Sequence, residues 1–347
     1  MRRSRQHHKN EAPVALKIAE SPALRTGRNR RKIPPRLPDT RSQPPTPKPA
    51  GARPLETIPD NFLGLPSRYC DPKKARYAIL PLPYDGTVSY QTGTRNGPRA
   101  IITASQQVEL FDEEYCKEFT AAGVMTCDPV APEMAGPKEM HESVYQAARQ
   151  VLAKKKFLIA LGGEHSLTSG LVRAVKQKHK KLSVLQIDAH ADLRAEYEGT
   201  PYSHAAVMRR VVEMGIPVVA VGIRNYSLGE HQFMKKHGIK PVSVREVRTN
   251  ADWLQQVVER LTDNVYVTID IDGFDPAYAP GTGTPEPGGL DWFQVTDLLK
   301  ATAMFRNIVA ADVVEVLPQP GTAQTEFLAA KLVYKLIAHI EANRRRA

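Results

Sequence analysis

Short apolar runs alternate with amphipathic stretches of about ten residues from Leu55 to the C-terminus, and this alternation predicts an α/β fold. The apolar runs place hydrophobic side chains on both of their faces, which is typical of parallel strands buried between two layers of helices. We find no internal repeat and no linker in this part of the sequence. The sequence therefore predicts one α/β domain in which helices cover both faces of a parallel sheet.

Strands and helices follow one another in order along this domain. The first strand, 77–82, leads into a turn-rich loop, 93–105, that feeds a helix after Gly97-Pro98. Periodic apolar positions predict further helices at 141–154, 167–178, 205–214, 230–236, 253–261, 295–305 and 325–342. Short runs between these helices predict strands at 157–161, 182–187, 218–222, 265–271 and 308–316.

The positive charge of the chain is concentrated in its first 54 residues. The formal net charge is +11, and residues 1–54 hold 14 Lys or Arg and 3 Asp or Glu, so the rest of the chain balances with 34 of each sign. The same segment holds 10 of the 28 prolines and few apolar residues. Such a segment buries too little apolar surface to offset the entropy of ordering. We therefore expect a disordered, Pro-rich basic tail at 1–54 and a single domain at 55–347.

Composition also limits the cellular compartment and the binding partners that we expect for this protein. No apolar run reaches about 18 residues, so the sequence predicts no membrane span. Cys70, Cys116 and Cys127 form neither a metal-ligand spacing nor a dense disulfide framework, which is typical of a reducing, cytoplasmic setting. Only the basic tail favours a nucleic-acid partner, and the charge-balanced remainder of the chain does not.

Four of the predicted strands end in a similar way, with an apolar run that leads to an acidic residue or a histidine. These runs reach His165, Asp192, Asp272 and Glu315. The carboxyl ends of strands in an open parallel sheet are where loops converge into binding sites. We therefore expect these sequence-distant residues to meet at one edge of the sheet.

The spacing of the acidic residues and histidines indicates a metal site. Segments 188–192 and 270–272 carry them at alternate positions, which project to one side of an extended backbone. Clustered carboxylates repel one another in a partly dry site unless cations neutralise them. Ligands rich in oxygen, with imidazole and no thiolate, favour Mn²⁺. The sequence predicts two divalent ions held by His165, Asp188, His190, Asp192, Asp270 and Asp272.

Three motifs resemble the signatures of the ureohydrolase family, which includes arginase and agmatinase. They are GGEHS at 162–166, DAHAD at 188–192 and DIDGFDP at 270–276, and they occur in the family's order. The stretches 83–99 and 279–290 are similar to the agmatinase branch in particular. The resemblance runs from about Phe62 to the C-terminal helix.

This resemblance implies a three-layer α/β/α fold with an eight-stranded parallel sheet and two Mn²⁺ per subunit. It implies that His165 and His190 each bind one ion, that Asp188 and Asp272 bridge or chelate, and that Asp192 and Asp270 complete the ligand shells. It also makes 55–347 a ureohydrolase catalytic domain, in a chain that is expected to form trimers or hexamers.

The resemblance also assigns three catalytic roles. Asp192 is expected to carry a proton to the leaving amine, and Glu315 to hold the guanidinium of the substrate. His204 stands where the family has a proton-shuttling histidine, although Ala205 replaces the glycine that usually follows it. The implied reaction is hydrolysis of agmatine to putrescine and urea.

The identity of the guanidino substrate stays open at this point. Arginases resemble one another in an Asn and a Ser-Gly-Asn set that bind an α-carboxylate, and this chain has Arg194 and Pro201-Tyr202-Ser203 there. We therefore expect agmatine to be preferred over arginine, with Glu196 and Glu198 favouring a cationic tail. An Arg194 that faces the pocket would instead favour guanidinobutyrate. N1-aminopropylagmatine and guanidine are further alternatives.

Two other classes of protein share part of this pattern. A metal-dependent deacetylase shares this general architecture but needs one Zn²⁺ and a single Asp-His-Asp set. Here His165 and the Asp270/Asp272 pair supply ligands for a second ion, which argues against a deacetylase. A nucleic-acid-binding protein with a degenerate enzyme body is disfavoured because every expected ligand is kept.

Overall fold

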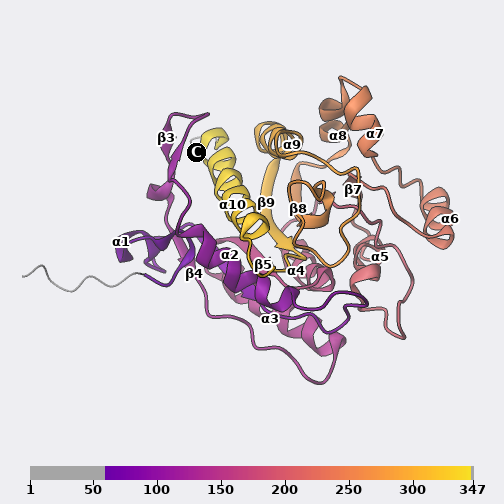
Figure 1. Ribbon diagram of the computed structural model, residues 1–347, viewed down its shortest axis with the longest axis horizontal. Helices are drawn as coiled ribbons and strands as arrows, with labels where there is room; N and C mark the ends of the chain where they lie inside the picture. Colours follow the sequence, from indigo (N-terminus) through magenta and orange to yellow (C-terminus); the bar gives the residue numbers. More distant parts are fainter. Residues whose placement is uncertain (1–58, 345–347) are drawn as a thin grey trace, which may run out of the picture. The chain divides into compact units, whose positions relative to one another are not determined.

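The computed structural model describes residues 59–344, and within that range seven strands form one parallel sheet (Figure 1). The strand order is β4-β1-β5-β9-β8-β6-β7, and a separate two-stranded hairpin pairs β2 with β3. The strands are β1 Tyr77–Leu82, β2 Phe111–Asp112, β3 Lys117–Glu118, β4 Val124–Thr126, β5 Phe157–Gly162, β6 Leu182–Ile187, β7 Val218–Val221, β8 Asn264–Asp270 and β9 Asn307–Val314. The predicted tail, 1–54, lies outside the described residues.

Helices cover both faces of this sheet, so the predicted three-layer α/β/α architecture is confirmed. Helices α9 and α10 lie side by side on one face, with α2 and α8 next to them, and α3, α4 and α5 pack together on the other face (Figure 1). The helices are α1 Ser67–Cys70, α2 Gly97–Ser105, α3 Pro137–Ala153, α4 Thr168–Lys176, α5 Val207–Glu213, α6 Leu228–His237, α7 Val244–Thr249, α8 Trp253–Arg260, α9 Trp292–Phe305 and α10 Gln324–Asn343. None of these described helices is long and apolar enough to cross a membrane.

Two hydrophobic cores separate the three layers. Alternate side chains of each strand enter opposite cores: Ile79 faces the core under α2 and α10, whereas Ala78 and Leu80 face the core under α3 and α4. Strands buried on both faces explain why their sequences read as continuous apolar runs rather than as an alternating pattern.

The expected number of strands, eight, was wrong: seven strands pair in the main sheet among the described residues. At the free side of β7, Val242 forms a single parallel bridge with Val221. The amide of Val242 donates to Ala220 O and Gly222 N donates to Val242 O. Pro241 has no N–H with which to extend this pairing, and Ser243 already caps α7. The eighth position of the sheet is thus reduced to one residue.

Strand order places the predicted site. Strands β5, β9, β8 and β6 are consecutive neighbours, so the four loops that follow them leave the same edge of the sheet side by side. The four motif-bearing strand ends predicted from the sequence are these four.

Candidate metal centre and active site

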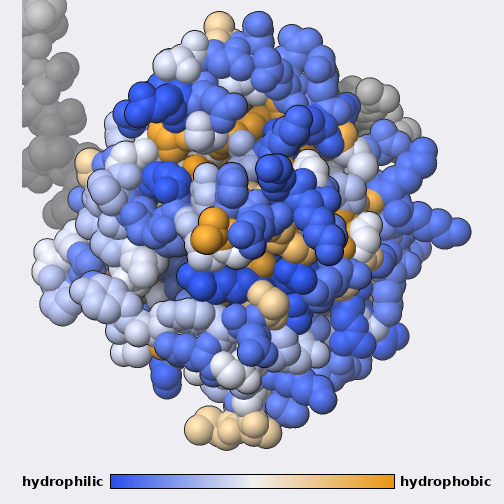
Figure 2. Space-filling view, turned by 90° about the vertical axis from the view of Figure 1, so that its right-hand side faces the viewer, coloured by the Kyte–Doolittle hydropathy of each residue, from blue (hydrophilic) through white to orange (hydrophobic). Residues whose placement is uncertain are grey.

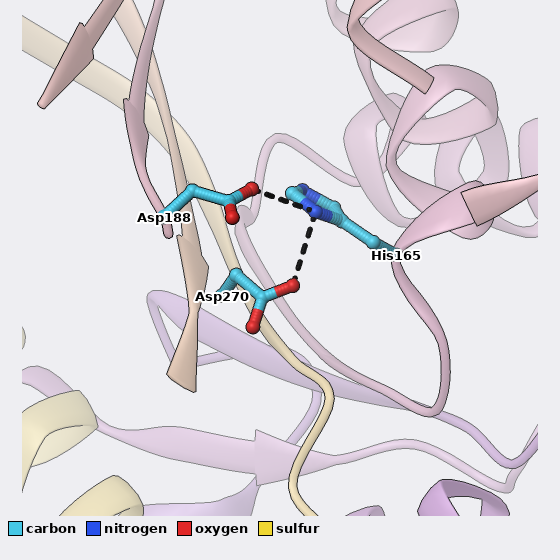
Figure 3. Close-up of side chains that lie close together, drawn as sticks. All are labelled: His165, Asp188 and Asp270. Carbon is cyan, nitrogen blue, oxygen red and sulfur yellow. Dashed lines mark ion pairs between the residues drawn. The ribbon is translucent and has the colours of Figure 1, made fainter. Parts of the chain in front are cut away.

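The imidazole of His165 faces three carboxylates at this edge. Its Nδ1 lies 3.2 Å from Asp188 Oδ2, 3.1 Å from Asp192 Oδ2 and 3.2 Å from Asp270 Oδ2. His165, Asp188 and Asp270 converge from three different strand ends (Figure 3). Within the described chain, Nδ1 of His165 is buried without a hydrogen-bond partner.

A second group lies next to the first and shares Asp188 with it. His190 Nδ1 is 2.8 Å from Asp272 Oδ2 and 3.8 Å from Asp188 Oδ1. Ligand atoms of His165, Asp188 and Asp270 form one close set, and those of Asp188, His190 and Asp272 form another. All six predicted ligands are therefore together, with Asp188 between the two sets.

Burial and crowding shift the pKa values of these groups. Burial, followed by the charges of Asp192 and Asp272, raises the pKa of Asp188 to about 7. Burial also raises the pKa of Asp270 well above its usual value. On Asp272 the neighbouring His190 outweighs burial and lowers the pKa to about 2. Burial lowers the pKa of His190, but the acidic neighbours outweigh it and raise the value to about 11.

This donor set fits two divalent cations. Four buried carboxylates repel one another in a medium of low dielectric constant, and a cation in each set would relieve that repulsion. The unpartnered Nδ1 of His165 supplies a nitrogen ligand that points at the carboxylates of its set. Oxygen and imidazole donors without thiolate are ligands for Mn²⁺ and similar ions.

The loop geometry corrects one part of the sequence argument. We expected 188–192 and 270–272 to be extended, but β6 ends at Ile187 and β8 ends at Asp270. Asp272 lies in a 3₁₀ turn, and Asp192 has a left-handed φ of 52°. Backbone amides fold the loops around the carboxylates, because His190 N donates to Asp188 Oδ1 and Asp272 N donates to Asp270 Oδ1.

Close backbone contacts require glycine beside the metal groups. A Cβ on Gly163 would lie 1.9 Å from Tyr84 O, and one on Gly273 would lie 2.8 Å from Asp188 N. The glycines of the first and third motifs therefore let loops from neighbouring strands approach each other.

Two residues that the sequence analysis missed hold the imidazole of His165 from behind. His165 Nε2 is 2.9 Å from Thr268 Oγ1, and Thr268 Oγ1 donates to Asp312 Oδ1 at 2.6 Å. Asp312 is fully buried and also accepts from Tyr266 and Thr168. Such outer partners fix the ring orientation of a metal-binding histidine. Their signal in the sequence is a polar residue inside each of two apolar strands.

Glu315 and His204 line the same pocket as the metal groups. Glu315 is buried, has a left-handed φ of 61°, and accepts a hydrogen bond from His165 N through Oε1 at 2.7 Å. Burial raises the pKa of Glu315 well above its usual value. His204 begins a 3₁₀ turn, and burial lowers its pKa. All eight predicted site residues thus surround one pocket or lie directly beneath it.

Comparison with known proteins agrees with this geometry. The sequence profile of the arginase family matches residues 75–339. The chain belongs to the arginase family. Members of this family are binuclear, metal-dependent enzymes, and the two candidate ligand sets described above fit that pattern. A single-zinc deacetylase is thereby excluded.

Several relatives of this arginase-family chain carry names of ureohydrolases. It is 35% identical to an N(1)-aminopropylagmatine ureohydrolase of Synechocystis sp., over 81% of this chain and 96% of that protein. It is 35% identical to an agmatinase of Pyrococcus horikoshii, over 77% of this chain and 93% of the relative. Its fold matches the agmatine ureohydrolase of Thermoplasma volcanium with a TM-score of 0.73 and 32% identity, covering 83% of this chain and 94% of that one.

These relatives make this chain an agmatinase-like ureohydrolase, a hydrolase that acts on guanidino C–N bonds. The predicted family and enzyme class are confirmed. The metal itself and the individual substrate stay predictions.

The acidic side chain in the outer part of the pocket is not one of those that the sequence analysis predicted. Arg194 and Glu230 both line this ureohydrolase pocket, and Arg194 Nε lies 3.9 Å from Glu230 Oε2. The guanidinium of Arg194 also lies over the ring of Tyr197, 5.0 Å from its centroid. Glu196 and Glu198, expected to favour a cationic tail, are exposed and lie outside the pocket lining. Glu230, which the sequence analysis did not single out, is the acidic residue in that region.

Arg224 is a further residue that the sequence analysis missed. Its guanidinium donates to Asp272 O at 2.7 Å and to Gly273 O at 3.3 Å, in the loop that carries one metal-ligand candidate. It also donates to Glu286 O at 2.7 Å, further along the same connection to α9. Arg224, in the loop after β7, therefore holds two parts of the connection between β8 and α9 together through main-chain oxygens.

Proposed function

We propose that this ureohydrolase hydrolyses agmatine to putrescine and urea with two Mn²⁺ per subunit. The observation that carries the proposal is the pair of ligand sets sharing Asp188, which lie beneath a pocket that also holds Glu315. In this proposal His165, Asp188, Asp192 and Asp270 hold one ion, and Asp188, His190 and Asp272 hold the other. Bound cations would supply Lewis-acid chemistry that acidifies water and makes hydroxide available near neutral pH.

The protein side chains have distinct roles in this proposal. Glu315 accepts hydrogen bonds from the guanidinium and so orients the substrate. Its fixed position supports this role, since His165 N already occupies one side of the carboxylate. Asp192 moves a proton to the leaving amine, which departs readily only when protonated. His204 exchanges that proton with bulk solvent from the edge of the pocket.

The charges of the pocket favour a cationic substrate. Apart from the candidate metal ligands, which bound cations would neutralise, two carboxylates line it, those of Glu230 and Glu315, against one guanidinium, that of Arg194. The contact with Glu230 partly neutralises Arg194 and directs it away from a free carboxylate. A substrate carboxylate in this pocket would face more anionic than cationic protein groups, which disfavours arginine and guanidinobutyrate.

N1-aminopropylagmatine is the second candidate substrate, and two observations favour it. Relatives with that name are 35–38% identical to this chain. The rings of Tyr90, Tyr197 and Tyr226 line the outer pocket, and Tyr90 is 72% exposed. Aromatic faces attract ammonium groups, so they suit the second amine of a longer tail.

A urea-release assay with added Mn²⁺ tests both candidates. We expect kcat/KM to be highest for agmatine or N1-aminopropylagmatine, and at least about a hundredfold lower for arginine and guanidinobutyrate. If the three tyrosine rings bind the second amine of N1-aminopropylagmatine, Tyr226→Ala should lower kcat/KM for that substrate more than for agmatine. A preference for arginine or guanidinobutyrate would overturn the proposal. The expected trimer or hexamer and the cytoplasmic location also stay predictions.

A further inference from the structure

The hydroxyl of Thr87 lies between a buried carboxylate and the imidazole of His204. Thr87 Oγ1 is 2.7 Å from Glu164 Oε1 on one side. On the other side it is 3.1 Å from His204 N and 3.3 Å from His204 Nδ1. Thr87 comes from the loop after β1 and His204 from the turn before α5, so the contact joins segments that are distant in sequence.

Glu164 provides a rigid acceptor for this hydroxyl. Its carboxylate is fully buried and accepts a hydrogen bond from Thr87 N through Oε2 at 2.6 Å. The hydroxyls of Ser166 and Thr87 both donate to its other oxygen. The amide of Glu164 donates to Tyr84 O, which fixes the backbone from which this side chain projects. Three donors thus converge on its two oxygens, and the hydroxyl of Thr87 is directed at Oε1.

The single hydroxyl hydrogen of Thr87 then favours one tautomer of His204, because Thr87 Oγ1 lies nearer to Nδ1, at 3.3 Å, than the Ser203 hydroxyl does, at 3.5 Å. Because that hydrogen goes to Glu164, Oγ1 of Thr87 has only lone pairs to offer His204. It accepts from the backbone amide of His204, and it accepts from Nδ1 only if Nδ1 carries the ring hydrogen. Nε2 of the neutral ring is then left with a free lone pair. The ring of Tyr197 packs edge to face on the imidazole, with 5.8 Å between ring centroids, and limits its rotation.

We propose that Thr87 is a positioning residue that holds His204 with its hydrogen on Nδ1, so that Nε2 is free to accept a proton. This inference rests on the proton-exchange role proposed for His204. Without the Thr87 hydroxyl, the imidazole of His204 would rotate or change tautomer. It would then exchange protons less often in the productive orientation. Because Thr87 does not line the pocket and its hydroxyl contacts Glu164 and His204 rather than a candidate metal ligand, its loss should act on turnover and not on substrate capture.

Thr87→Val tests the inference because valine keeps the branched shape and removes the hydroxyl. In the Mn²⁺-loaded enzyme we expect kcat to fall on the order of tenfold, with KM within about twofold and metal content unchanged. Thr87→Ser restores the hydroxyl and should return kcat to within about threefold of the parent. The matched control is Thr249→Val, which removes an exposed hydroxyl on α7 that bonds only Arg245 O.

A double variant separates positioning from a general structural role. If Thr87 acts through His204, then adding Thr87→Val to His204→Asn should lower kcat no further. Additive losses, a Thr87→Val enzyme with unchanged kcat, or a loss that Thr87→Ser does not restore would overturn the inference. Thr87→Ala replaces Thr87→Val if the valine variant does not fold, and the same outcomes apply. An unchanged kcat in His204→Asn alone would instead overturn the proposed role of His204.

Discussion

The carboxylate of Asp188 faces both imidazoles of the candidate metal centre, 3.2 Å from His165 Nδ1 and 3.8 Å from His190 Nδ1. Asp272 belongs to the His190 set alone. Metal affinity depends on the number and orientation of ligands, so the two residues should differ when they are removed.

Asp188→Ala should therefore lower metal content from about two ions per chain to nearly none, whereas Asp272→Ala should retain about one. Both variants should lose turnover, and chelation of the parent enzyme should do the same until Mn²⁺ is restored. Elemental analysis after gel filtration measures the content. Asp263→Ala, at an exposed carboxylate, is the control and should keep both ions. Full metal content in Asp188→Ala would contradict the shared-ligand assignment.

Glu315 and His204 should affect different kinetic constants. Glu315→Gln weakens capture of the guanidinium in the ground state and the transition state, so kcat/KM should fall by about a hundredfold or more. His204→Asn removes proton exchange during turnover, so kcat should fall by about a hundredfold with little change in KM. Steady-state kinetics on metal-loaded enzyme measures kcat and KM for each variant. Metal loss in either variant would assign that residue to the ligand shell instead.

At the scale of single residues, the sequence predicts the candidate ligands but not the groups that orient them. The six ligand candidates lie in short motifs at strand ends, where alternate spacing and the position after an apolar run reveal them. Thr268 and Asp312 become partners only because β8 and β9 pair in a register that sets them opposite each other. Thr87 meets His204 only after two distant loops fold together. Such contacts depend on pairing between distant segments, which a local pattern does not contain.

At the scale of elements, long periodic segments were predicted well and short ones were missed. Strands β1 and β6 have the predicted boundaries, 77–82 and 182–187. Strand β4 has three residues and α7 has six, too few to show a periodic pattern. Helix α3 begins at Pro137, four residues before the predicted start, because proline is accommodated in the first turn of a helix.

Helix α10 carries a buried histidine that should make stability depend on pH. His339 is fully buried, its Nδ1 is 2.8 Å from the Tyr115 hydroxyl, and burial lowers its pKa to about 4. Between pH 6.5 and 4 the unfolded chain binds a proton at this histidine and the folded chain does not. Stability contributed by the neutral ring is therefore present above about pH 6.5 and lost as the pH falls toward 4.

His339→Leu should remove this part of the pH dependence. Relative to the variant, the parent should lose about 2–3 kcal/mol of unfolding free energy between pH 7 and pH 4. Denaturation of both metal-free proteins by urea across that range measures the difference. Loss of packing or of the Tyr115 contact would shift the variant equally at every pH, so the slope of the difference isolates the titration. Parallel curves would show that His339 titrates normally in the folded protein.

The charges of the whole molecule divide sharply along the chain. Residues beyond position 54 carry 34 positive and 34 negative side chains, so the +11 excess belongs to the first 54 residues. Hydrophilic side chains cover most of the face shown in Figure 2, with hydrophobic residues in small separate patches. Every candidate ligand and every described strand and helix lies at or after Phe62. We therefore expect catalysis and charge to be separable properties of this chain.

Deletion of residues 1–54 should leave kcat, KM and metal content unchanged, because no candidate site residue is removed. The truncated chain should have a net charge near zero at pH 7, bind cation exchangers weakly and be less soluble near neutral pH. A full-length variant with the Lys and Arg of 1–54 changed to Gln separates charge from length, and it should behave like the truncation on the exchanger. If the full chain alone retains RNA, and does so with a steep dependence on salt, the tail has a binding role of its own. The Gln variant keeps the backbone and the apolar residues of the tail, whereas the truncation lacks them. An inactive or misfolded truncation beside an active Gln variant would therefore show that the tail packs on the catalytic domain.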